Sequence, residues 1–155
     1  MNKYSLAIMT LVSLFSTAHA SEPNMQMQTG WWSHQVYDLH NREIIDSRDS
    51  QCRSAPTDHD LWQQVNEEFN NYDDCYSPHV KRHGNTIIAS ITCTDLDADE
   101  RTIKRYTPTA YDSQHRIIAY RSEGKFTRRT AKRTSVKKWI SQDKWQGACP
   151  ANPPN

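Results

Sequence analysis

Glycine and long apolar runs are both scarce in this sequence. Only 4 glycines occur among its 155 residues. None of them belongs to a phosphate-binding loop or to the Gly-x-Ser-x-Gly turn that carries a hydrolase serine. The mean hydropathy is −0.91, and after residue 20 no segment approaches the ~20 apolar residues of a membrane-spanning helix. The sequence therefore excludes a nucleotide loop and predicts no transmembrane segment in the mature chain.

Metal-binding spacings are absent from the sequence as well. No Cys-x-x-Cys or His-Glu-x-x-His segment occurs, although both are common frameworks for zinc. Two histidines four apart on a strand, such as His79 and His83, lie ~13 Å apart when the strand is extended. Neighbouring carboxylates such as Asp73 and Asp74 point to opposite faces of an extended chain. We therefore expect no cofactor and no metal, and we assign no catalytic residue.

The first twenty residues are typical of a secretory signal peptide. Lys3 supplies the positive start, residues 6–15 are apolar, and Ala18-His19-Ala20 gives the pattern that a signal peptidase requires. The apolar segment is too short to span a bilayer as a helix. We predict cleavage between Ala20 and Ser21, and a mature protein in the periplasm or outside the cell.

After cleavage the chain has the size of about one domain. Residues 1–20 form the signal peptide, residues 21–29 a flexible polar leader, residues 30–149 a single β-rich domain and residues 150–155 a disordered tail. Only 35% of the residues are apolar, and a chain of this size buries only about two-thirds of its unfolded surface. Covalent cross-links should therefore matter for stability.

All four cysteines lie in the mature region, and an even number in an oxidising compartment indicates disulfides. Four cysteines allow three pairings. A hairpin centred on Gly84 places Cys75 and Cys93 opposite each other, because each lies nine residues from the glycine. Opposed Cβ atoms lie ~4.5–5.5 Å apart, which suits a disulfide after small adjustments. We therefore predict a Cys75–Cys93 disulfide, and Cys52–Cys149 follows by elimination.

Charge is balanced overall but divided along the chain. Residues 21–100 carry 15 acidic and 5 basic side chains, whereas residues 101–155 carry 3 acidic and 13 basic ones. The two halves either neutralise each other in the fold, which their close cancellation favours, or the basic half forms an anion-binding surface. The basic segment also contains Phe126 and precedes Trp139, a mixture that suits polyanions. The candidate anion-binding residues are Arg128, Arg129, Lys132, Arg133, Lys137 and Lys138.

The first part of the mature sequence predicts two extended pieces and one helix. A strand is expected over residues 30–40, and a short extended piece around Cys52. A helix should follow Pro56, with Thr57 as its N-cap and Asp60 as an acidic capping partner. Asn70-Asn71 should end it. The helix should bury an apolar stripe formed by Leu61, Trp62, Val65 and Phe69.

From Cys75 onward the sequence favours strands. Turns are expected at His83-Gly84-Asn85, over the acidic residues 95–100 and over residues 112–115. Pro108 within a strand indicates an edge position or a bulge. The stretch 134–145 fits a strand, although its apolar residues also fit a helix face. The predicted fold is α+β and β-rich: an antiparallel meander that forms a curved sheet or partial barrel, with one helix packed on it.

An ordered set of short motifs accompanies this pattern. It comprises Gly30-Trp31-Trp32, Gln51-Cys52 before the helix, a Gly-Asn hairpin, Thr92-Cys93 and the closing Trp145-Gln146-Gly147-Ala148-Cys149. Over residues 30–149 this set resembles the exported bacterial family called "domain of unknown function 3617". The resemblance implies export and a β-rich fold. The basic segment before Trp139 and the scarcity of hairpin glycines depart from the family pattern. The family brings no established reaction, so it assigns no catalytic residue.

These observations favour a non-enzymatic binding or interaction domain in the envelope of a Gram-negative bacterium. Its ligand would be either a small apolar molecule on a concave sheet face or an acidic protein or other polyanion on the basic C-terminal strands. Nucleic acid is a less natural partner for an exported protein. Two alternatives stay open: a hydrolase of envelope polymers that uses carboxylates or a histidine, and an inhibitor or immunity protein that blocks such a hydrolase.

Overall fold

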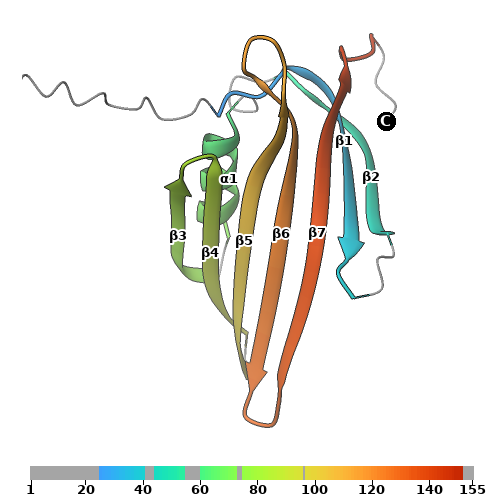
Figure 1. The fold of residues 1–155 in the computed structure, drawn as a ribbon. Coiled ribbons are helices and arrows are strands. Elements are labelled where there is room, and N and C mark those ends of the chain that lie inside the picture. Colours follow the sequence, from blue (N-terminus) through green and yellow to red (C-terminus); the bar gives the residue numbers. More distant parts are fainter. Residues whose placement is uncertain (1–24, 41–43, 55–59, 73–74, 96, 152–155) are drawn as a thin grey trace, which may run out of the picture.

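The structure is a computed structural model, and it describes residues 25–40, 44–54, 60–72, 75–95 and 97–151. Within these residues, seven strands form one antiparallel sheet that does not close on itself, and one helix packs against it (Figure 1). The predicted β-rich α+β fold is therefore confirmed. In chain order the elements are β1 (Gly30–Asp38), β2 (Ile44–Arg53), α1 (Leu61–Asn70), β3 (Cys75–His83), β4 (Thr86–Asp95), β5 (Ala98–Tyr111), β6 (Ile117–Thr130) and β7 (Thr134–Gly147).

The sheet combines a meander with a hairpin added at one end. Its strand order is β2-β1-β7-β6-β5-β4-β3, so β3 to β7 follow one another, whereas β1 joins the far side of β7. The pairing of Trp31 with Gly147 brings the two ends of the domain together. The Cα atoms of Cys52 and Cys149 then lie 5.5 Å apart, and a disulfide joins the two residues, as predicted.

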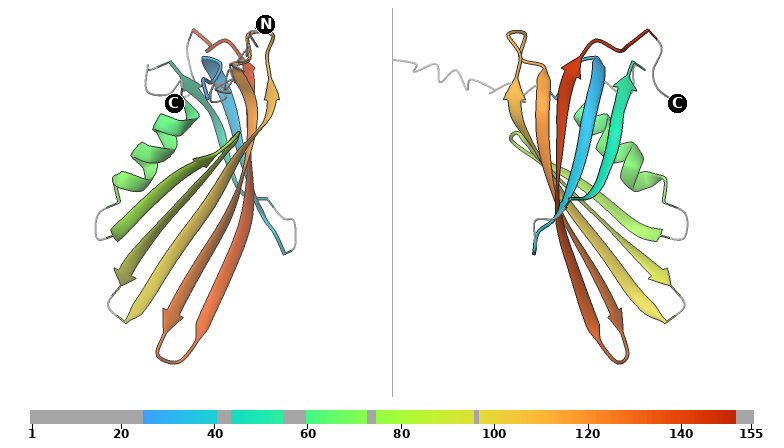
Figure 2. Two further views of the ribbon diagram at one scale, coloured as in Figure 1. Left: turned by 60° about the vertical axis from the view of Figure 1, so that its left-hand side comes forward. Right: turned by 90° about the vertical axis from the view of Figure 1, so that its right-hand side faces the viewer.

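The two faces of the sheet differ because side chains alternate along each strand. On β4, Ile87, Ala89 and Ile91 are buried, while Ile88 is only half-buried. We call the side that carries the buried residues and α1 the helix face. The opposite side, the open face, carries no described element (Figure 2). Among the described residues, the hydrophobic core therefore lies on one side of the sheet.

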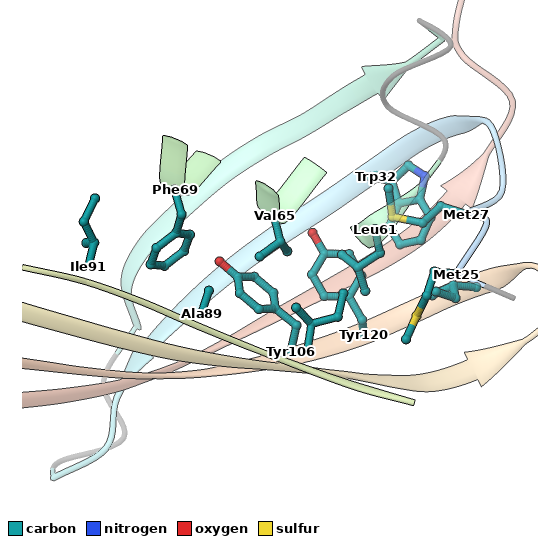
Figure 3. Packing of buried hydrophobic residues seen from close by; sticks show 12 residues of the cluster. Met25, Met27, Trp32, Leu61, Val65, Phe69, Ala89, Ile91, Tyr106 and Tyr120 are labelled. Atoms are coloured by element: carbon teal, nitrogen blue, oxygen red, sulfur yellow. The ribbon is translucent and has the colours of Figure 1, made fainter. Parts of the chain in front are cut away.

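The core fills the space between α1 and the helix face (Figure 3). Trp32 is 1% exposed, and its ring centroid lies 6.0 Å from that of Tyr120. The hydroxyls of Tyr106 and Tyr120 point toward the helix (Figure 3). Burial of a large apolar side chain contributes about 1.5–3 kcal/mol, so these aromatic residues are major contributors to stability.

Helix α1 begins directly after Asp60, whose carboxylate accepts a hydrogen bond from the backbone N–H of Gln63 at 3.0 Å. Asp60 is therefore the N-cap, and the prediction that Thr57 caps the helix is wrong. Both residues are of a capping type, but only Asp60 immediately precedes the apolar stripe; Thr57 lies outside the described residues. The helix ends at the predicted asparagines, with Asn71 as its C-cap. Its buried residues are Leu61, Val65 and Phe69, while Trp62 is partly buried.

Residues 25–29 are not the flexible leader that their polar composition predicts. Met25 and Met27 are each 2% exposed, and Met27 forms a parallel bridge with Ile117. The two methionines alternate with glutamines, and this period of two places both on the buried side. The predicted leader is therefore corrected over residues 25–29, and residues 21–24 lie outside the described part of the chain.

Strands β2, β4 and β5 are longer than their predicted segments. β2 covers ten residues instead of a short piece around Cys52, and β4 continues to Asp95 while β5 begins at Ala98. The acidic turn is therefore shorter than expected. Pro108 lies beyond the last pairing of β5 with β4, next to a register shift with β6, so the predicted edge or bulge is confirmed.

The β3–β4 hairpin turns over Gly84 and Asn85, because His83 pairs directly with Thr86. Gly84 has a φ of 58°, in the left-handed region that glycine enters without steric cost. The predicted hairpin is therefore present, but its centre lies between two residues rather than on Gly84. If the pairing continued from this turn without interruption, Cys93 would lie opposite Tyr76 rather than opposite its predicted partner, Cys75.

One extra residue in β3 corrects this register. The pairing shifts between Tyr76 and His79, and Ser77 in this bulge has a φ of 56°. Beyond the bulge Cys75 lies opposite Cys93, with the Cα atoms 4.1 Å apart, and the two form a disulfide. The predicted pairing is confirmed, although it depends on a bulge that the symmetric count about Gly84 did not include.

No helix among the described residues is long and apolar enough to cross a membrane. The two disulfides, which bond all four cysteines of the chain, indicate an extracytoplasmic compartment.

We predict that the two disulfides stabilise the domain unequally. Cys52 and Cys149 are 97 residues apart, whereas Cys75 and Cys93 are 18 apart. Restriction of the unfolded chain then contributes about 4.7 kcal/mol for the long loop and about 3 kcal/mol for the short one. Urea unfolding of the two double Cys→Ser variants measures both losses. A larger loss for the short loop would contradict an origin in the unfolded state.

Candidate anion-binding face

A buried ion pair lies within the core on the helix face. Arg53 and Asp143 are 6% and 3% exposed, and Nη2 of Arg53 lies 3.0 Å from Oδ1 of Asp143. The guanidinium also donates to the Tyr120 hydroxyl at 3.1 Å and to the Gln64 side-chain oxygen at 3.2 Å, and lies 4.8 Å from the ring centroid of Trp32. Such a pair is tolerated in a core only when its other hydrogen bonds are also made. It joins β1, β2, β6, β7 and α1.

His34 connects this ion pair to solvent. Its side chain is 34% exposed, and Nδ1 lies 3.1 Å from both carboxylate oxygens of Asp143. A carboxylate that orients an imidazole is one part of a hydrolase triad. Among the described residues, no serine or threonine hydroxyl and no cysteine thiol forms a hydrogen bond with His34. The described groups therefore hold the imidazole in place without supplying a nucleophile.

A second polar contact fastens α1 to β5. The Tyr106 hydroxyl donates to one oxygen of Glu68 at 2.7 Å, and the Lys104 ammonium pairs with the other. Burial is the main cause that raises the pKa of Tyr106 far above its ordinary value, and the Glu68 carboxylate raises it further. Burial also raises the pKa of Tyr120, with Asp143 as the next cause. Both phenols are therefore neutral hydrogen-bonding groups of the core at physiological pH.

The predicted basic segment forms the projecting end of the β6–β7 hairpin. Side chains alternate between the two faces along each strand, so the strand register divides this segment into three groups. On the open face lie Lys125, Arg129 and Lys138, on the helix face lie Arg128 and Lys137, and at the hairpin tip lie Lys132 and Arg133.

Arg128 is the member of this segment that pairs with the acidic half of the chain. Its Nη2 lies 3.2 Å from a carboxylate oxygen of Asp95, and its Nε lies 3.4 Å from Glu100. Mutual neutralisation of the two halves is therefore present, but it involves one of the six candidates. Within the described residues no ion pair engages the other five, which are Arg129, Lys132, Arg133, Lys137 and Lys138.

Lys125 and Lys138 lie directly opposite each other on the open face. Opposed Cβ atoms are ~4.5–5.5 Å apart, and like charges at this spacing destabilise a sheet. Both side chains are exposed, and no described carboxylate forms an ion pair with either of them. An anion bound between the two ammonium groups would relieve this repulsion.

Two shallow hollows on the open face share Ile103 and Lys125 as lining residues. The larger has a volume of about 490 Å³ and is also lined by Ile88, Ile140 and Lys138. The smaller has a volume of about 360 Å³. Arginines from neighbouring strands complete the walls: Arg105 and Arg121 in the larger hollow, Arg101 and Arg129 in the smaller one.

The open face of strands β3–β7 is strongly basic. Alternation places eight basic and two acidic side chains on it, and one of the acids, Glu123, pairs with Arg121 at 2.9 Å. An excess of one sign over a surface attracts ions of the other. The basic residues are Lys81, Arg101, Arg105, Arg121, Lys125, Arg129, Lys138 and Lys144, and the acidic ones are Asp99 and Glu123.

The aromatic residues of the basic segment lie on the other side of the sheet. Phe126 and Trp139 alternate onto the helix face, away from Lys125 and Lys138. The Trp139 indole lies over Gly124, where any Cβ would collide with the ring. The mixture of charge and stacking that single-stranded nucleic acid requires is therefore not formed by these neighbours in sequence.

Sequence reasoning missed the arginines that β5 and β6 contribute. Arg101, Arg105 and Arg121 lie outside the densest basic run, and only the sheet register brings them beside Lys125. One pattern in the sequence could have identified them: in β5, every second position is occupied by Arg101, Ile103 and Arg105, which places all three on the same face.

Among the described residues, no group of three or more His, Cys, Asp or Glu side chains is placed to hold a metal ion. Comparison of the chain with protein-family models, with curated proteins and with solved structures finds no match.

We predict that loss of Asp143 destabilises the domain severely. Asp143→Ala leaves the buried Arg53 guanidinium without its carboxylate, which costs about 3–5 kcal/mol. The Arg53→Met/Asp143→Leu double variant removes both charges and should recover most of this loss. Urea unfolding followed by circular dichroism measures both. A single variant with a loss below about 1 kcal/mol would contradict this role.

We also predict that stability falls as the pH rises above ~10. The raised pKa values of Tyr106 and Tyr120 mean that the folded state keeps two protons that the unfolded chain releases above pH ~10. Their contribution is complete below that pH and is lost above it. Tyr106→Phe should show a shallower fall in unfolding free energy between pH 8 and pH 11. Equal slopes for the variant and the wild type would contradict the linkage.

Proposed function

We propose that this chain is an exported, non-enzymatic binding domain whose open face holds an anionic partner in the bacterial envelope. The observation that carries the proposal is the opposed Lys125–Lys138 pair on a face with no described covering element. Like charges at directly opposed positions of a sheet are unfavourable in the free protein. Binding of an anion between them removes that penalty, so the site is more stable when it is occupied.

The apolar residues between the charges narrow the class of partner. Ile103 pairs with Lys125, which in turn pairs with Lys138. On the far side of Lys138, the backbone N–H of Leu39 donates to the Lys138 carbonyl. An apolar residue therefore lies on each side of the lysine pair. The floor of the larger hollow adds Ile140. Electrostatic attraction steers the partner to this face, and burial of apolar area adds affinity. The preferred partner therefore carries both acidic and apolar groups.

The helix face supports binding of a small apolar ligand less well. Its apolar residues pack against α1 and against Met25 and Met27, so they already form the core. The hydrolase alternative has His34 and Asp143 in its favour but lacks a described nucleophile. Export from the signal-like first twenty residues, the periplasmic location and membership of the "domain of unknown function 3617" family all stay predictions.

We predict that the mature protein binds dextran sulfate, a polyanion without a peptide backbone, and that affinity falls with added salt. Lys138→Glu should weaken binding by about tenfold, which corresponds to ~1.4 kcal/mol. Lys132→Glu is the matched control, because Lys132 is exposed at the hairpin tip, outside the strands that carry Lys125 and Lys138. It should change affinity by less than about threefold. Isothermal titration calorimetry at two salt concentrations measures these effects.

Equal losses for the two variants would show attraction to net charge alone, and would contradict a site on the open face. Failure of the wild-type protein to bind dextran sulfate at low salt would contradict the proposed function itself.

A further inference from the structure

Strand β7 extends past the end of β1, so part of its edge has no neighbouring strand among the described residues. β1 pairs with β7 only as far as Asp38, opposite Trp139, whereas β6 pairs with β7 as far as Thr134. Figure 1 shows the β6–β7 hairpin projecting beyond the β1–β2 hairpin. Residues 134–138 therefore have β6 on one side and no described strand on the other.

Alternate residues of this segment direct their backbone groups to the free edge. The Lys138 carbonyl accepts a hydrogen bond from the Leu39 N–H at 3.1 Å, so the backbone of Lys138 faces the β1 side. In an antiparallel strand each residue directs its N–H and C=O to the same side, and the side alternates along the strand. Thr134 and Val136 therefore direct both groups away from β6. No described residue forms a backbone hydrogen bond with either group.

A notch of about 760 Å³ opens beside this edge. Leu39 and Val136 are its apolar lining and are 46% and 49% exposed, while Lys125, Lys137 and Lys138 are its basic lining.

Among the described residues that line this notch, the one carboxylate is that of Asp38. It already accepts a hydrogen bond from the backbone N–H of His40 at 2.6 Å. The notch therefore offers unpaired backbone groups, apolar surface and an excess of positive charge.

We propose that this edge binds an extended acidic peptide segment of a partner protein, which adds to the sheet as a strand in line with β1. The inference rests on the proposed function, since Lys125 and Lys138 belong to the open face. In strand addition, main-chain hydrogen bonds supply affinity and alternate side chains supply specificity. A second copy of this chain is disfavoured at this edge, because it would bring a second basic hairpin end, with Lys132, Arg133, Lys137 and Lys138, against the first.

The register specifies the side chains of the peptide. Leu39 already lies opposite Lys138, so a strand that continues the direction of β1 meets Lys137, Val136 and Ser135 in that order. Opposite charges and apolar pairs at directly facing positions stabilise a sheet. The recognised pattern is therefore an acidic residue followed by an apolar one, opposite Lys137 and Val136, within an extended segment.

The test uses the acetylated peptide Ser-Glu-Glu-Val-Thr-Val, the mature protein and dextran sulfate as a charge-only reference. Val136→Pro removes a backbone N–H that faces the free edge and leaves the β6 ladder intact, and proline is tolerated at such an edge. Peptide affinity should fall at least about fivefold, as expected for one lost hydrogen bond, while affinity for dextran sulfate stays the same. Val136→Ala keeps the N–H and is the matched control for the side chain.

A second arm leaves the protein unchanged. N-methylation of the peptide at the residue opposite Val136 removes a donor without altering charge, and should weaken binding as much as Val136→Pro does. Equal affinity of the parent and N-methylated peptides, or of wild type and Val136→Pro, would overturn strand addition while leaving the open face as a binding site. Absence of dextran sulfate binding by the wild type would instead overturn the proposed function.

Discussion

The ion pair between Arg53 and Asp143 is the contact on which the arrangement of the domain depends. The two residues are 90 apart in sequence, and their pairing holds the added β1–β2 hairpin against the meander. A buried guanidinium is costly unless its donors are satisfied, so the contacts of Arg53 with Gln64, Tyr120 and Asp143 restrict how α1, β6 and β7 lie against β2. Because the core on this helix face takes up α1 and residues 25–29, the opposite face is free to carry charge.

Much of the fold follows from local patterns in the sequence. The stripe of Leu61, Val65 and Phe69 predicts the helix, and alternation predicts most of the strands. The Cys75–Cys93 pairing could be predicted from two matching distances to the hairpin, but only because a bulge shifts the register by one residue. The burial of residues 25–29 could not be predicted from the sequence. Their composition is polar, and the core surface against which Met25 and Met27 pack exists only in the folded domain.

The candidate site was predictable only in part. The dense basic run identifies Lys138, but the alternation of side chains along β7 places its neighbour Lys137 on the other face of the sheet. Arg105 and Arg121 join the site through strand pairing, which the sequence does not specify until the register is known. The free edge of β7 depends on the difference in length between two hairpins. Such relations between distant segments belong to the topology of the sheet rather than to any one motif.

The central claim is that the open face is the binding surface. Isoleucine side chains lie on both faces of the sheet, so their NMR signals can test this claim. Ile88, Ile103 and Ile140 lie on the open face, whereas Ile87 and Ile91 lie in the core. Methyl NMR of isoleucine-labelled protein, titrated with dextran sulfate, therefore compares both faces in one experiment. We predict progressive shifts at the three open-face methyls and none at the core pair. Shifts confined to the core methyls would contradict the account.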